Sequence, residues 1–122
     1  MQPLPKLKHL LFIFTHAGTA DFRAKEGVDA LLAAAAFEQD ISVVFMADGV
    51  WALHSHNNPG TLGLPAINKQ LPALELYGID KLYALGADMT QRGIACELEN
   101  LHLIDSQQLT ALISEASQVL RF

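Results

Sequence analysis

The feature that most constrains the fold is a strand, turn, helix and strand between His9 and Val50. Residues 10–14 form an unbroken apolar run without alternation, which is typical of a strand buried on both faces. Apolar residues then recur at helical spacing over 24–36, and residues 41–47 form a second apolar run. Two such strands joined by one helix form a βαβ unit, so we predict parallel strands with a right-handed crossover.

Polar residues mark the ends of these elements. Thr19 or Asp21 is predicted to cap the first helix by accepting from its free N–H groups, and Asp40 to close it. Asp48-Gly49 is predicted to form a turn after the second strand, followed by one helical turn over 50–53.

Strands and helices continue to alternate along the rest of the chain. Asp88 is predicted to cap the short helix after the third strand, and Asp105 or Ser106 the last helix. We expect helices over 66–77 (ended by Gly78), 88–93 and 107–116, and strands over 81–85, 101–104 and 118–122. The chain is therefore predicted to be α/β: one domain over residues 1–122, with three α/β/α layers on a mainly parallel five-stranded sheet.

Charge and composition exclude several classes of function. The net charge is -5 and the pI about 5.4, which argues against direct nucleic-acid binding because phosphate contacts need clustered Lys and Arg. No apolar segment reaches the roughly 20 residues needed to cross a bilayer, and we read no signal peptide. With a single cysteine the chain makes no internal disulfide, which fits the cytoplasm.

The apolar content predicts a partner. The chain is 51% hydrophobic and 17% charged, where about 25% charged is usual. A small domain leaves much of its surface in water, so part of this excess is expected outside as an interface. We therefore expect an oligomer, with Ala30–Phe37 and Val50–Leu53 as candidate contact segments.

Candidate ligand residues lie where strands end, because ligands bind beyond the carboxyl ends of parallel strands. These ends carry residues 15–18, 48–49, 86–88 and 105–106. The first turn has Gly18 alone and lacks a nucleotide fingerprint, which disfavours a nucleotide or flavin. A small-ligand domain that uses 15–19 and 48–49 stays open as an alternative.

Other side chains have a structural interpretation beside a chemical one. His54 and His56, joined by His16, could bind a metal, but no Cys or carboxylate cluster completes such a site. Asp48 could be a base, although an Asp-Gly pair after a strand more often makes a turn. Cys96 has acidic neighbours that disfavour a thiolate, so we interpret it as a filler rather than a sulfur carrier. No catalytic, cofactor or metal residue is assigned.

Two blocks of sequence resemble a known family. Residues 18–33 read GTADFRAKEGVDALLA and residues 45–50 read FMADGV. Together with Arg92-Gly93 and the terminal VLRF, they are similar to the DsrE/DsrF-like superfamily, and within it to the TusC (DsrF-type) subunits of the bacterial sulfur relay.

The resemblance implies a non-catalytic, cofactor-free subunit of a dimer of heterotrimers with TusB-like and TusD-like partners. Such a complex passes persulfide sulfur for 2-thiolation of the tRNA wobble uridine. The family's carrier cysteine belongs to the TusD-type subunit, and its position falls here at Leu85–Ala87, which holds no thiol. A DsrF-type subunit for sulfur oxidation, or a carrier that uses Cys96, are the alternatives.

Overall fold

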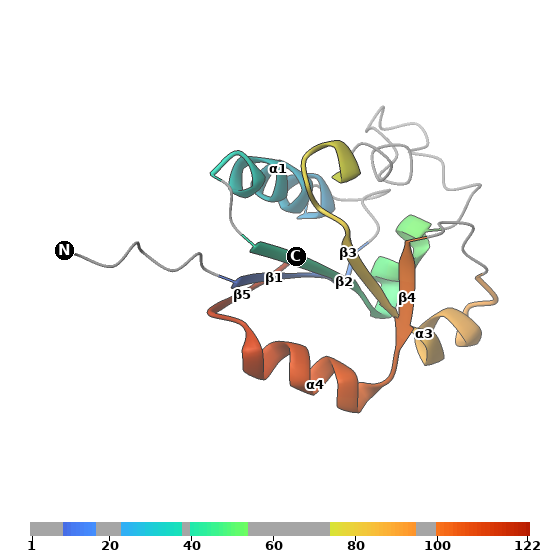
Figure 1. Ribbon diagram of the computed structural model, residues 1–122. Coiled ribbons are helices and arrows are strands. Elements are labelled where there is room, and N and C mark those ends of the chain that lie inside the picture. Colours follow the sequence, from blue (N-terminus) through green and yellow to red (C-terminus); the bar gives the residue numbers. More distant parts are fainter. Residues whose placement is uncertain (1–8, 17–22, 38–39, 54–73, 95–99) are drawn as a thin grey trace, which may run out of the picture.

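Five parallel strands form the sheet of the computed structural model, in the order β4-β3-β2-β1-β5 (Figure 1). The structure describes residues 9–16, 23–37, 40–53, 74–94 and 100–122. The strands are β1 (His9–Phe14), β2 (Asp40–Phe45), β3 (Lys81–Leu85), β4 (Leu101–Ile104) and β5 (Gln118–Arg121). The expected α/β fold on a five-stranded sheet is confirmed, and every described strand pair is parallel.

Helices cover both faces of the sheet. They are α1 (Arg23–Ala35), the 3-10 helix η1 (Ala47–Leu53), α3 (Gly86–Gln91) and α4 (Ser106–Glu115), with a helical turn at 74–76. Figure 1 shows α1 on one face and α4 on the opposite face, which gives the three layers. Most of the helix expected over 66–77, and its start in particular, lies outside the described residues.

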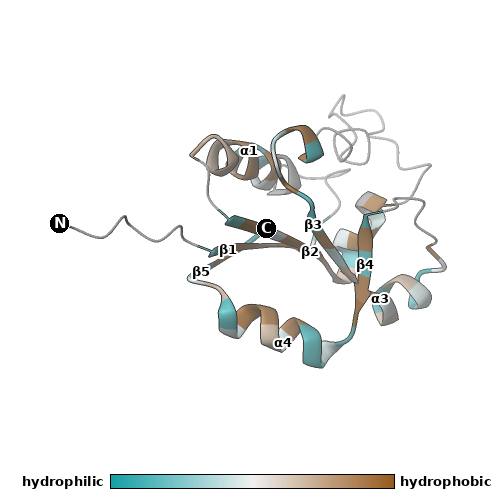
Figure 2. Cartoon of the chain, in the orientation of Figure 1, coloured by the Kyte–Doolittle hydropathy of each residue, from teal (hydrophilic) through white to brown (hydrophobic). Residues whose placement is uncertain are grey.

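The unbroken apolar runs predicted two-sided burial correctly. In both β1 and β2 five of six residues are buried, and Figure 2 shows these strands as hydrophobic over most of their length. Alternate residues point to opposite faces of a strand, so each strand feeds two cores. The core beneath α1 contains Phe12, Phe14 and Leu31, and the smaller core beneath α4 contains Leu11 and Val44.

The order of the strands defines where a ligand could bind. From β1 to β4 each strand is added to the same side of the sheet, and the chain then crosses back to place β5 beside β1. The connections that leave β3 and β4 therefore run in opposite directions. Such a switch point opens a crevice at the carboxyl ends of its two strands.

The end of β2 differs from the prediction. The strand stops at Phe45 rather than Ala47, and Asp48 and Gly49 lie in η1 instead of a tight turn. The Met46 N–H still donates to the Phe14 carbonyl at 3.0 Å, which continues the parallel pairing, and Ala47 then adopts a φ of 50°, which turns the chain out of the sheet.

Two helix ends confirm the sequence signals, and others do not. Asp105 caps α4 in a capping box with Gln108, as predicted, whereas Ser106 is the first helical residue. Gly78, at a φ of 81°, ends the turn at 74–76. Asp40 does not close α1, which ends at Ala35, because Asp40 already pairs within the sheet. Thr19 and Asp21 lie outside the described residues.

Gly49 and Gly86 give a matched test of this packing. A Cβ on Gly49 would lie 1.9 Å from the Phe14 carbonyl oxygen, which is fixed backbone, so we expect Gly49→Ala to cost about 3 kcal/mol or more of unfolding free energy. A Cβ on Gly86 would meet the Leu103 Cβ at 3.8 Å, an ordinary contact, so Gly86→Ala should change stability by about 1 kcal/mol at most. Urea unfolding measures both, and equal losses would contradict the packing.

Candidate functional site

The carboxyl end of β1 is closed by the end of β5. The Thr15 N–H and hydroxyl both donate to the Phe122 carbonyl, at 2.6 and 2.8 Å, and Thr15 is buried. The Phe122 ring stacks on Phe12 and Phe14, with centroids 6.0 and 5.9 Å apart. His16 Nδ1 lies 3.0 Å from the Thr15 hydroxyl. The described part of this predicted ligand turn therefore holds strands together.

The ends of β2 and β3 are joined by the Asp88 carboxylate, whose role differs from the predicted one. Asp88 was expected to cap the short helix, but α3 begins at Gly86 without a side-chain cap. The Asp88 Oδ2 instead accepts the Ala47 N–H at 2.6 Å, across 41 residues of chain. Asp88 thus holds the strained turn after β2, a role that no local pattern could indicate.

Asp48, the candidate base, lies in an exposed ion pair beside this turn. Arg92 donates to the Asp48 Oδ1 from Nε at 3.3 Å and from Nη2 at 3.2 Å, and to the Asp88 carbonyl from Nη1 at 3.2 Å. The Asp48 side chain is 72% exposed. Because Arg92 holds this carboxylate at the surface, the structure favours the structural interpretation of Asp48 over a catalytic one.

The switch point between β3 and β4 carries an open hollow of about 600 Å³. Its apolar side is formed by Leu85, Leu103 and Ile104, and its polar side by Asp105 and other residues that open α3 and α4. The position Leu85–Ala87, where the resemblance places the carrier cysteine of related subunits, lies in its wall. Its place at the switch point is where open α/β sheets bind ligands. Among the residues that the structure describes, none that lines the hollow is a thiol.

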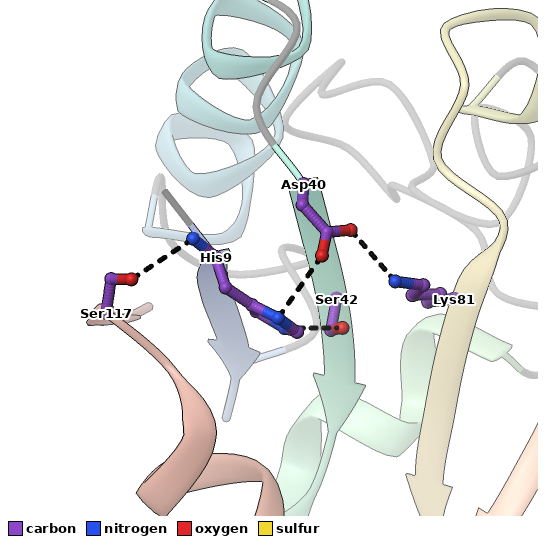
Figure 3. Close-up of polar contacts among 5 residues, drawn as sticks. All are labelled: His9, Asp40, Ser42, Lys81 and Ser117. Atoms are coloured by element: carbon purple, nitrogen blue, oxygen red, sulfur yellow. Dashed lines mark hydrogen bonds and ion pairs between the residues drawn. The ribbon is translucent and has the colours of Figure 1, made fainter. Parts of the chain in front are cut away.

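A polar cluster lies at the opposite, amino ends of the strands (Figure 3). His9 Nδ1 is 3.3 Å from Asp40 Oδ2, and His9 Nε2 is 3.1 Å from the Ser42 hydroxyl. Lys81 Nζ donates to the other oxygen of Asp40 at 2.9 Å. These residues are far apart in the sequence and meet only because the parallel register pairs His9 with Asp40.

The chemistry open to this cluster is limited by burial. Ser42 lies within β2 and is 1% exposed, so a substrate carbonyl cannot reach its hydroxyl. The Asp40 carboxylate only accepts, so His9 Nδ1 carries a proton, and Ser42 can donate to Nε2 or accept from it. The polar atoms of His9, Asp40 and Ser42 therefore satisfy one another. The cluster joins three strands and does not form a hydrolase site.

The same contacts shift one pKa. The hydrogen bond from Lys81 to Asp40 raises the pKa of the Lys81 ammonium above its ordinary value. The contribution of the Lys81–Asp40 ion pair to the unfolding free energy is thus complete below that ordinary value, and it is lost as the pH rises through the raised pKa. Both partners are about two-fifths exposed, so the contribution is that of a surface ion pair.

Metal and membrane functions find no support in the part of the chain that the structure describes. Within it no three His, Cys, Asp or Glu side chains gather as a metal site, and no helix is long and apolar enough to cross a membrane. His54, His56 and Cys96 lie outside the described residues.

Removal of the Asp40 carboxylate should destabilise the protein in a pH-dependent way. We expect Asp40→Asn to lower the unfolding free energy by about 0.5–1 kcal/mol between pH 8 and pH 9. The difference from the parent protein should shrink as the pH rises from 10.5, the ordinary pKa of lysine, through the raised pKa of Lys81. Glu115→Gln, which removes an exposed carboxylate from α4, serves as the control. A difference that persists unchanged to pH 11.5 would contradict the assignment.

Burial also predicts that Ser42 is chemically inert. Incubation of the native protein with a fluorophosphonate probe, followed by peptide mass spectrometry, should show no adduct on Ser42, because its hydroxyl is out of reach. Labelling of the native protein that Ser42→Ala abolishes would overturn the structural interpretation of the cluster.

Comparison with known proteins supports the resemblance. Residues 8–122 match the DsrE/DsrF-like family. The chain is 31% identical over 118 residues to a Vibrio vulnificus protein named "Protein TusC homolog", which covers 95% of this chain and 100% of the relative. A "Protein TusC" from Shigella flexneri is 33% identical over 88 residues, 72% of this chain and 74% of its own.

A solved structure supports the fold independently. The crystal structure of the ychN protein from E. coli superposes with a TM-score of 0.77 at 19% identity, and covers 96% of this chain and 100% of that protein. The fold, the match over 8–122 and the relatives agree: the chain belongs to the DsrE/DsrF-like family.

Proposed function

We propose that this chain is a non-catalytic subunit of a TusBCD-like sulfur-relay complex. In that role it supports persulfide transfer for 2-thiolation of the tRNA wobble uridine, in the cytoplasm. Two findings support the proposal: relatives named TusC align with nearly the whole chain, and the described residues that line the switch-point hollow include no thiol. The lack of a thiol in the described lining is the observation behind the non-catalytic role, since only a thiol can accept and pass on a persulfide sulfur.

The wall of the hollow has room for a side chain that it does not carry. At Gly86 an added Cβ would make only ordinary contacts, with Leu103 at 3.8 Å and the Ile104 carbonyl at 3.9 Å. The Cβ of a cysteine would therefore fit there without a backbone shift. The wall therefore lacks a thiol because glycine occupies position 86, and not because the space is blocked. This is expected of a subunit that has the fold of the family while a partner subunit transfers the sulfur.

Exposed apolar side chains support partner subunits. Large hydrophobic residues are more than half exposed at Phe37 (75%), Leu76 (88%), Tyr77 (55%) and Leu103 (62%). Phe37 lies in one of the contact segments predicted from the sequence, and the other contains Trp51, which is 38% exposed. An exposed apolar patch marks an interaction site, so we propose that these side chains contribute to contacts with partner subunits. The proposed partners are TusB-like and TusD-like chains in a heterohexamer.

The charges of the described residues support an indirect role toward tRNA. Lys81 and Arg92 each lie against a carboxylate, Asp40 and Asp48 respectively, and so are not arranged to bind phosphates. The chain carries 13 acidic and 8 basic residues. A surface that binds RNA needs clustered basic charge, so we propose that another protein contacts the nucleic acid.

Native mass tests the subunit proposal directly. We expect the protein, purified from its own cells with a mild tag, to carry two other small α/β chains in equal amounts, because its exposed apolar residues need cover. Native mass spectrometry gives the stoichiometry and peptide sequencing the identity of the chains. Isolation as a homo-oligomer alone would contradict the proposal.

Deletion and rescue test the role of this chain in sulfur transfer. Loss of the gene should abolish 2-thiouridine in the affected tRNAs, measured by nucleoside mass spectrometry, and the Cys96→Ser variant should restore it, because this chain passes no sulfur. Rescue by the parent protein controls for expression. Failure of a stably expressed Cys96→Ser variant would instead favour the carrier function. Unchanged 2-thiouridine after deletion would contradict the role in tRNA thiolation and leave sulfur oxidation as the alternative.

A further inference from the structure

We draw no further inference here: the strongest candidate, the apolar hollow of about 600 Å³ at the switch point between β3 and β4, carries nothing because no contact among the described residues shows what covers it.

Discussion

The structure depends on the close packing around the last residues of β1. The Phe14 carbonyl accepts the Met46 N–H and faces Gly49 so closely that no side chain fits there. One residue later Thr15 binds the end of β5 with its N–H and its hydroxyl. Three segments far apart in the chain therefore meet at one strand end. Since β1 is the strand that pairs with both β2 and β5, this junction fixes how the two parts of the sheet join.

The amino ends of the strands are joined by side chains instead. There His9, Asp40 and Lys81 form one line of polar contacts across β1, β2 and β3. Ser117 adds the start of β5, because its hydroxyl accepts the His9 N–H at 3.2 Å. The polar groups lie where the sheet reaches solvent, and the apolar runs lie between the two ends. An arrangement that resembles a catalytic triad thus arises from the needs of sheet pairing.

The sequence was sufficient for the elements and insufficient for the contacts between them. The strand of residues 10–14 could be predicted because burial on both faces leaves an unbroken apolar run, and the cap at Asp105 because its partner lies three residues away. The role of Asp88 could not, since its partner, Ala47, is 41 residues distant and has a backbone angle that no local pattern implies. The contact of His9 with Ser42 depends on the register of two strands, which the sequence leaves open.

The hollow at the switch point connects this fold to its proposed function. The hollow lies between the carboxyl ends of β3 and β4, where the strand order places a switch point. What differs between chains is the residue in its wall, and here Gly86 leaves space that a side chain could fill. In this chain a Cβ at that point would need no change of backbone. Loss of the thiol would in turn leave the fold and its interaction surfaces intact. In the arrangement proposed for this chain, the residue at position 86 distinguishes a subunit that carries sulfur from one that only binds its partners.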